Sequence, residues 1–199
     1  MDLKLSFTDK EVTPWSGVVL LKKMLDRMDF DAQLDQLPLP VQGSNRGYDA
    51  KQLIKQFMTS VWCGANRFEH CEVTRADEVI RQAWGFKRMA GRKAFQRFFD
   101  KHTTALNHHI FTPFYQWFFS KLQFDNYTLD VDSSVFTRYG NQQGSKKGYN
   151  PQKPGRNSHH PLIAFIEETK MVANFWLRSG NTHSSNNIHG FLCDTIDKL

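Results

Sequence analysis

The segment Tyr127–Asn181 constrains the fold of this 199-residue chain more than any other part. After Asn126 the spacing of apolar residues changes from the helical period of about 3.6 to the strand period of 2. The run YTLDVDSSVF therefore predicts a strand that carries Asp130 and Asp132. The runs HPLIAFIEET and MVANFWLRSGN predict two further strands, and IHGFLCDTIDKL predicts a helix after them. We expect a second domain, of mixed α/β type, over residues 126–199.

The preceding part of the chain, residues 1–125, predicts an all-α region. Apolar residues at helical spacing indicate a helix over Thr13–Asp29, with its threonine as the N-cap and a proline in the first turn. The stretch PLPVQGSNRGYD has the composition of a loop and ends in Asp49, which is placed to cap a wide apolar helix that stops near Gly64. An aromatic run over Phe111–Leu122 predicts a buried helix.

A basic amphipathic helix is expected over residues 91–106, GRKAFQRFFDKHTTAL, after a turn with two glycines. Its Phe residues share one face and its cations lie off that face. The cations are Arg92, Lys93, Arg97 and Lys101. A helix, a turn and a basic helix form the pattern of a helix-turn-helix, whose second helix enters the major groove of DNA. The alternative is an ordinary helix with a solvated basic face.

Positive charge is concentrated in two windows of the chain, whose formal net charge is +6. Lys87–Lys101 holds six basic residues and one acidic residue, and Arg138–His160 holds five basic residues and none that is acidic. Local positive charge in an otherwise mildly acidic chain indicates a polyanionic partner, because binding to phosphates releases condensed counterions. A merely solvated basic surface is the alternative.

Nothing in the sequence indicates a membrane protein or a secreted one. The chain has no run of about 18 apolar residues, and its first residues lack the apolar core and cleavage site of a signal peptide. Three scattered cysteines, Cys63, Cys71 and Cys193, do not form a disulfide framework. We therefore expect a cytoplasmic protein.

Asp130 and Asp132 are two residues apart on the predicted strand, so their carboxylates project from the same face about 7 Å apart. Carboxylates on an otherwise apolar strand normally pair with a cation, accept hydrogen bonds or bind a metal ion. A metal site is one reading. A structural acid paired with a nearby Arg or Lys, or a surface strand end, is the other.

The acid-free stretch after this strand predicts a loop that contacts phosphates. Its cations alternate with glycine and proline, so positive charge is presented on a backbone that a ligand can approach closely. The cations are Arg138, Lys146, Lys147, Lys153 and Arg156. Such contacts bind the DNA backbone without reading bases. Two-metal phosphoryl chemistry requires several carboxylates from different elements, and one strand does not supply them all.

The run LDVDSSVFTRYGNQQGSKKGYNPQKPGRNSHHPLIAF, followed by MVANFWLRSGNTHSSNN, resembles the DDE-type transposases of bacterial insertion sequences, DDE domain group 1. The resemblance covers nearly the whole chain. It implies a ribonuclease H-like catalytic domain in which two aspartates and a glutamate hold Mg²⁺ or Mn²⁺, and which cuts and joins DNA at the terminal inverted repeats of the element. Asp132, directly before Ser133, matches the first family aspartate, and Asp130 is its neighbour in the site.

No segment matches the second aspartate or the glutamate of that family. We therefore expect an N-terminal fragment or the product of a disrupted gene, with the first three strands and one helix of a ribonuclease H-like domain. Its expected activity is DNA binding without strand cleavage, and its unpaired first strand favours self-association. The alternative is a noncatalytic DNA-binding or partner-binding protein that competes with intact transposase.

The last helix is not expected to supply the missing acids. Its apolar spacing predicts a buried side that includes Phe191 and Ile196, which leaves Asp194 and Asp197 facing water.

Overall fold

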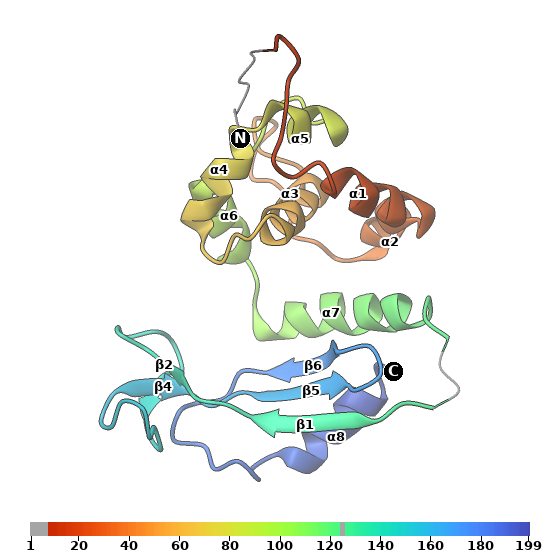
Figure 1. Ribbon diagram of the computed structural model, residues 1–199. Coiled ribbons are helices and arrows are strands. Elements are labelled where there is room, and N and C mark those ends of the chain that lie inside the picture. Colours follow the sequence, from red (N-terminus) through yellow and green to blue (C-terminus); the bar gives the residue numbers. More distant parts are fainter. Residues whose placement is uncertain (1–7, 124–125) are drawn as a thin grey trace, which may run out of the picture. The chain divides into compact units, whose positions relative to one another are not determined.

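The computed structural model describes residues 8–123 and 126–199, which form a mixed α+β structure. A helical N-terminal half precedes two small antiparallel sheets and a C-terminal helix (Figure 1). The chain divides into two compact units, Met1–Phe111 and Thr112–Leu199. Residue 125, at the expected domain boundary between residues 125 and 126, lies outside the described part of the chain. That boundary therefore stays a prediction.

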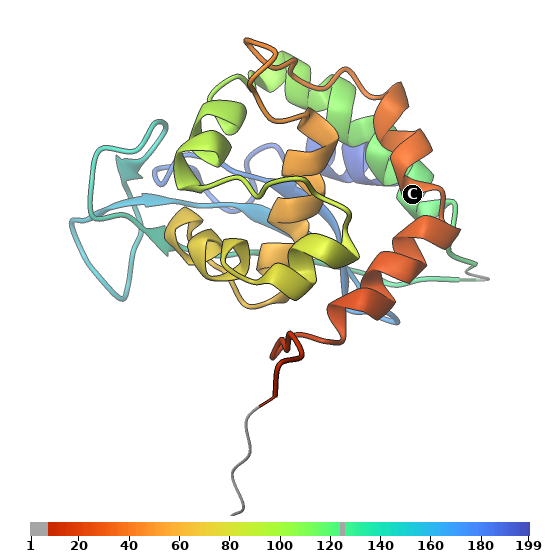
Figure 2. The same ribbon diagram turned by 90° about the horizontal axis from the view of Figure 1, so that it is seen from above.

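Unit 1 is built from short helices, as the sequence predicts. They are α1 (Val18–Arg27), α2 (Phe30–Gln36), α3 (Ala50–Trp62), the 3-10 turn η1 (Phe68–His70), α4 (Cys71–Arg75), α5 (Glu78–Ala83) and α6 (Arg92–Phe99). Helix α3, orange in Figure 2, contacts α2, α4 and α6. The Asp49 carboxylate caps α3 by accepting the Gln52 N–H at 3.2 Å, and Gly64 adopts φ +95° where the helix stops. Both of these predictions are confirmed.

A buried glutamine fixes the turn that leads into α6. Gln56 is fully buried, and its amide donates to the Ala90 carbonyl and accepts the Ala90 N–H, each at 2.7 Å. Ala90 belongs with Leu53, Phe95 and Phe98 to the buried core of the unit. Because both groups of the Gln56 amide and both backbone groups of Ala90 are satisfied, the turn and α3 form one fixed frame for α6.

Two helices of unit 1 differ from the prediction. Helix α1 begins at Val18 rather than at Thr13, because the Thr13 hydroxyl accepts the Trp15 N–H within a preceding turn. The long helix expected over 91–106 ends at Phe99, and α7 (Thr104–Phe119) begins separately. The Thr103 side chain accepts the Leu106 N–H at 3.2 Å, which makes it the N-cap of a new helix.

The main sheet of unit 2 contains the three strands expected from the sequence. They are β1 (Leu129–Ser133), β5 (Leu162–Ile166) and β6 (Met171–Trp176), in the order β1-β5-β6 and antiparallel throughout. Helix α8 (Ile188–Ile196) follows them. The strands and the helix are confirmed, and β1 lies at the edge of this sheet. The ribonuclease H-like fold itself stays a prediction.

One face of the main sheet carries the core of unit 2. Leu162, Ala164 and Ile166 of β5 are buried against Phe191 of α8 and Phe119 of α7. Leu129 and Val131 of β1 pack against the same cluster, so alternation along the strand turns Asp130 and Asp132 to the opposite face.

The basic stretch after β1, expected to be a loop, contains a second small sheet. Strands β2 (Phe136–Thr137), β3 (Lys146–Lys147) and β4 (Asn157–His159) pair in the order β2-β4-β3. Two backbone segments far apart in the sequence meet beside it. A Cβ added at Gly180 would lie 2.3 Å from the Ser158 carbonyl oxygen, and one at Gly148 would lie 1.8 Å from the Gly180 oxygen. Only glycine permits this approach.

A buried arginine shapes the segment that follows β6. The Arg178 side chain donates from Nε to the His160 carbonyl at 2.9 Å and from Nη1 to the Asn186 carbonyl at 2.6 Å. The same Nη1 lies 3.2 Å from the carbonyls of His183 and Ser184. Arg178 therefore ties the start of β5 to the connection between β6 and α8.

Candidate nucleic-acid interface

The two aspartates of β1 lie side by side on the solvent face of the main sheet. Both are exposed, and their cross-strand neighbours on β5 are Phe165 and Ile163. One carboxylate oxygen of Asp132 accepts the Ser133 N–H at 2.7 Å. Within residues 8–123 and 126–199 neither aspartate forms an ion pair with an Arg or Lys, so the alternative of a structural salt bridge is not found there. Their assignment to a catalytic site stays a prediction.

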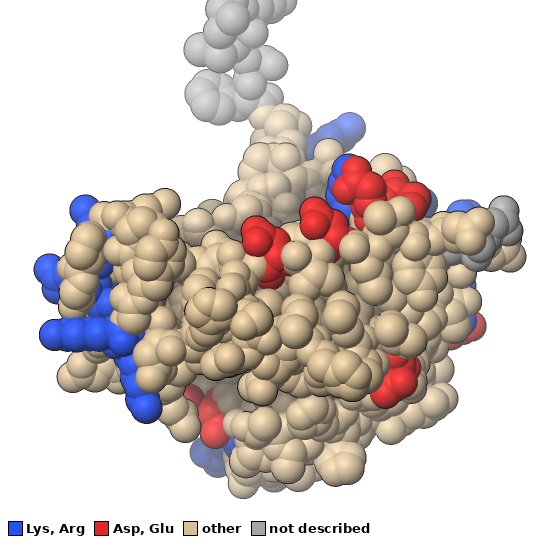
Figure 3. Space-filling model, turned by 90° about the horizontal axis from the view of Figure 1, so that it is seen from below, with Lys and Arg blue, Asp and Glu red and all other residues tan. Residues whose placement is uncertain are grey.

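The cations after β1 gather around a hollow in the second sheet. Arg138, Lys147 and Arg156 line a cavity of about 340 Å³ together with Tyr139, and the described residues around it include no Asp or Glu. Figure 3 shows Lys and Arg side chains collected over this sheet. The hollow therefore brings together three of the five cations predicted from the sequence. Lys146 and Lys153 do not line it.

Arg138 is held in place by a histidine. Its Nε donates to Nδ1 of His159 at 2.9 Å, and the His159 Nε2 lies 3.0 Å from the Gln143 carbonyl. Because a guanidinium only donates, Nδ1 must be the acceptor and Nε2 must carry the hydrogen of a neutral imidazole. His159 is 4% exposed, so this support is rigid, and the Arg138 guanidinium also lies 5.7 Å from the Phe136 ring centroid.

A second cation of the hollow lies over an exposed aromatic ring. The Arg156 guanidinium is 5.8 Å from the ring centroid of Tyr139, of which 74% is exposed. Arg138 and Arg156 thus each rest on an aromatic face, and their guanidinium donors other than Arg138 Nε remain available to a ligand. The arrangement suits an anion with several acceptor oxygens, such as a phosphodiester.

The acids fit a divalent metal ion in kind but not in number. Carboxylate oxygens are the ligands that Mg²⁺ prefers, and Asp130 and Asp132 supply two such groups from one strand. Among the described residues no group of three His, Cys, Asp or Glu is placed to hold a metal ion. The donor set of this part of the chain is therefore incomplete for a two-metal site.

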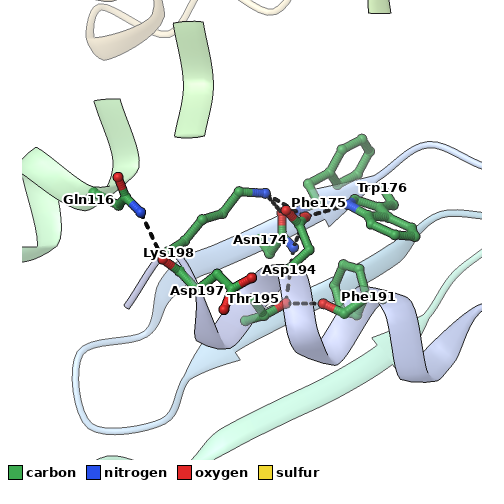
Figure 4. A network of polar contacts seen from close by, with 9 residues as sticks. All are labelled: Gln116, Asn174, Phe175, Trp176, Phe191, Asp194, Thr195, Asp197 and Lys198. Carbon is green, nitrogen blue, oxygen red and sulfur yellow. Dashed lines mark hydrogen bonds and ion pairs between the residues drawn. The ribbon is translucent and has the colours of Figure 1, made fainter. Parts of the chain in front are cut away.

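Asp194 does not complete that set, and the prediction that it faces water is wrong. Its Oδ2 accepts from Lys198 Nζ at 2.6 Å, from the Trp176 indole at 2.7 Å and from the Asn174 amide at 2.9 Å (Figure 4). The network lies on the core side of the sheet, opposite to the β1 acids. Burial alone would raise the pKa of Asp194, but the bonds from Lys198, Asn174 and Trp176 outweigh it and lower that pKa.

The other expectations for α8 have mixed outcomes. Asp197 is exposed, as predicted, whereas Ile196 is 61% exposed although it was expected to be buried. The buried side of the helix runs instead through Phe191, Thr195 and Lys198. A polar network therefore replaces part of the apolar stripe on which the prediction depended.

In unit 1, the N-terminal end of α6 is partly neutralised. Arg92 Nη1 pairs with Glu69 at 3.0 Å, and the Arg92 N–H donates to the Glu72 carboxylate at 2.7 Å. Glu72 also pairs with Arg75 at 2.8 Å. The Arg92 N–H and then Arg75 lower the pKa of Glu72, so this carboxylate stays charged beside the helix. Arg92 is less available to DNA than its place on a basic face predicts.

The remaining cations predicted on this helix lie in different settings. Lys93 and Arg97 are exposed, and neither takes part in an ion pair within the described part of the chain. Lys101 lies beyond the end of α6, and its Nζ donates to the Val41 carbonyl at 2.7 Å. Their assignment to DNA contact stays a prediction.

A cationic groove beside α6 was not predicted. Arg97 and Lys101 line it together with Arg46, Tyr48 and Arg88, which lie on the connection between α2 and α3 and on the turn before α6. Arg88 lies in the basic window Lys87–Lys101, so the sequence indicated that it could contact a polyanion but not that it lines a groove. No local pattern indicates that the residues around Arg46 lie next to α6.

No helix of the described residues is long and apolar enough to cross a membrane.

Comparison with known proteins agrees with the resemblance seen in the sequence. No curated protein and no solved structure matches the chain. The family model described as Transposase DDE domain group 1 matches residues 1–199, which is the whole of the sequence. Membership implies DNA binding and a role in DNA transposition, and members of the family generally use Mg²⁺. The resemblance is thereby confirmed, and the chain belongs to the DDE group 1 transposases.

Proposed function

We propose that this polypeptide binds the phosphodiester backbone of DNA through the cationic hollow of its second sheet, next to the acid-bearing strand of a transposase site. The observation that carries the proposal is the convergence of Arg138, Lys147 and Arg156 on one cavity whose described lining contains no acid. In this proposal Lys146 and Lys153, on the same acid-free stretch, add outer contacts to the DNA backbone.

The β1 acids and the hollow are close enough to act on one DNA segment. Asp132 and Arg138 are six residues apart in the sequence, so their Cα atoms are separated by at most about 22 Å. A DNA strand covers that distance in about six nucleotides, at 3.4 Å each along the axis. We propose that Asp132, with Asp130, faces the DNA segment whose flanking phosphates the hollow binds.

The topology of unit 2 supports a ribonuclease H-like domain. Three antiparallel strands in the order β1-β5-β6, followed by α8, correspond to the first three strands and the first helix expected for that fold. The edge position of β1 leaves a place beside the aspartates for a further strand. We include this fold in the proposal as its structural part.

Strand cleavage is not expected of residues 1–199. The chemistry requires carboxylates from several elements, whereas Asp130 and Asp132 come from one strand. We therefore propose DNA binding without turnover for this polypeptide. Asp132 is the proposed ligand of Mg²⁺ or Mn²⁺ where further acids are present. A nicking assay on duplex DNA with Mg²⁺ tests this, and multiple turnover by the purified chain would contradict it.

The hollow is tested by removing its charges. The triple variant Arg138→Gln, Lys147→Gln, Arg156→Gln should bind a random duplex more weakly, as measured by fluorescence anisotropy at several salt concentrations. Three lost phosphate contacts reduce the slope of log K against log salt by about 2.7. A variant with the same loss of charge at exposed lysines elsewhere, Lys10→Gln, Lys23→Gln and Lys170→Gln, is the matched control. Equal losses in the two variants would refute the proposal.

A noncatalytic protein that competes with intact transposase for its DNA is the second candidate. The exposure of both β1 acids and their origin on a single strand favour it. Asp132→Ala distinguishes a site that holds Mg²⁺ together with DNA from a pure binding module. A pure binding module keeps or gains DNA affinity through lost repulsion, whereas affinity that depends on Mg²⁺ falls in the variant.

A further inference from the structure

Two hollows of about 490 Å³ each are lined by residues of α6, and they differ in how their charges are balanced. Both are lined by Tyr48, Ala94 and Arg97. The first, which we call the α6 groove, is completed by the segment Pro40–Gly47 and by the turn before α6. Its cations are Arg46, Arg88, Arg97 and Lys101, and its described lining contains no Asp or Glu. The second contains Glu69 and Glu72.

The second hollow has counter-ions within its own lining. Glu69 pairs with Arg92 and Glu72 pairs with Arg75, so two of its four cations are balanced within the fold. The α6 groove has no such balance. Its hydrogen bonds go to backbone carbonyls, which orient a cation without neutralising it. Four like charges around one groove repel each other, and a polyanion would relieve that repulsion.

The α6 groove is formed before any ligand binds. The Arg88 guanidinium donates from Nη2 to the carbonyls of Arg46 and Gly47, and it lies 4.2 Å from the ring centroid of Tyr48. Lys101 holds the other end of the segment through the Val41 carbonyl. These four contacts fix the connection between α2 and α3, the orange segment before α3 in Figure 2, along α6. A preformed site avoids the ordering cost of binding.

The compact turn in this segment depends on a glycine. The Gly47 N–H donates to the Ser44 carbonyl at 2.9 Å, and a Cβ at Gly47 would lie 2.8 Å from Cβ of Gln42. Arg46 is therefore presented from a closed turn rather than from a loose chain. Its side chain and that of Arg97 are exposed, and neither forms an ion pair within the described residues.

We propose that the α6 groove is a second binding site for the DNA backbone, in which Arg46 and Arg97 contact phosphates while Arg88 and Lys101 hold the segment that forms the wall. The identity of the polyanion rests on the proposed function of the chain as a DNA-binding transposase. The contact differs from a helix-turn-helix reading of α6, because it joins Arg97 to Arg46 on a neighbouring segment and does not use Arg92 and Lys93 at the start of the helix.

The test compares two charge-matched double variants of the full chain. Arg46→Gln with Arg97→Gln should lower the affinity for a random duplex and reduce the slope of log K against log salt by about 1.8, which corresponds to two phosphates. Arg92→Gln with Lys93→Gln should change the slope by less than half as much. All four side chains lie on the surface or at its edge, so both variants should keep the far-UV circular dichroism of the parent chain.

The outcomes separate this inference from the proposed function. The inference is wrong if the salt slope is unchanged in the Arg46 and Arg97 variant, or if it changes more in the Arg92 and Lys93 variant. In either case the proposed function still stands if the hollow variant in unit 2 loses affinity. If neither the groove pair nor the hollow variant loses affinity, both proposals fail. If poly-glutamate abolishes the contribution of the groove at concentrations that leave binding by the hollow intact, the groove binds acidic protein and the inference is wrong.

Arg88 is tested as a positioning residue. Arg88→Lys keeps the charge but cannot donate to two carbonyls and stack on Tyr48 at once. We expect faster proteolysis within residues 41–47 and a weaker DNA affinity at an unchanged salt slope. Proteolysis at the rate of the parent chain would show that Arg88 does not hold the segment.

Discussion

Replacing Asp194 with alanine tests the polar network that attaches α8 to the main sheet. The change removes three hydrogen bonds to Oδ2 and leaves the ammonium group of Lys198, whose side chain is 7% exposed, without its counter-ion. Breaking a buried ion pair at one partner lowers the free energy of unfolding by about 3 to 5 kcal/mol.

The lower end of that range applies here for two structural reasons. The Asp194 side chain is 20% exposed, so it is only partly desolvated. Lys198 also keeps a hydrogen bond to the side-chain oxygen of Asn174 at 2.9 Å. We therefore expect Asp194→Ala to lower the free energy of unfolding of unit 2 by about 3 kcal/mol.

The assay is urea denaturation followed by the indole N–H signal of Trp176 in NMR spectra. This group donates to Asp194, so its signal reports unit 2 without a contribution from the rest of the chain. Asp197→Ala is the matched control, because that residue is the C-cap of the same helix and has an exposed side chain. It should change the free energy of unfolding by less than about 0.5 kcal/mol.

A second variant distinguishes the contribution of the ion pair to stability from that of side-chain packing. Asp194→Leu combined with Lys198→Met removes both charges and should recover most of the stability, because a buried pair contributes little more than apolar side chains of similar volume. A loss below about 1 kcal/mol in Asp194→Ala, or a loss equal to that of the Asp197 control, would refute the reasoning.

Three other expectations concern unit 2. Because the folded-state pKa of Asp194 is lowered, its contribution to stability should be complete above the ordinary aspartate pKa of about 3.9 and decline as pH falls through the folded value; urea midpoints of the parent chain should therefore fall more steeply below pH 4 than those of Asp194→Ala. Gly180→Ala should destabilise the fold by about 3 kcal/mol in thermal melts, because its Cβ meets two backbone oxygens, whereas Gly190→Ala in α8, with 3.7 Å to Trp176, should be neutral or stabilising. Residues 1–199 should self-associate through the outer edge of β1 in sedimentation experiments, and a well-behaved monomer at high concentration would count against that open edge.

Local signals in the sequence predicted much of the secondary structure. Asp49 and Gly64 bound α3 because capping and left-handed backbone depend on residue type at one position. The three strands of the main sheet follow from alternation over five or six residues. The end of α6 was missed although Thr103 is a good N-cap, because the helical spacing of the Phe face continued across it to Leu106 and received more weight.

Contacts between distant segments account for most of what the sequence did not predict. Strands β2, β3 and β4 have only two or three residues each, so their pairing depends on partners up to about twenty residues away. The α6 groove joins Val41 to Lys101 across sixty positions. The inward turn of Lys198 depends on Asp194 and Asn174 together, and hydrophobic spacing alone favoured Ile196 for that side.

The close backbone approach at Gly148 and Gly180 determines how much of the chain a fragment must contain to keep the hollow of the second sheet folded. The arginine-lined depression lies on strands that end at His159, yet the wall behind those strands is made by main chain twenty residues further on, which Arg178 anchors. A peptide that stopped after β4 would carry every phosphate-binding side chain and lack the support that keeps them convergent. Because Arg178 is itself held by the Asn186 carbonyl, the smallest transferable unit extends at least through Asn186.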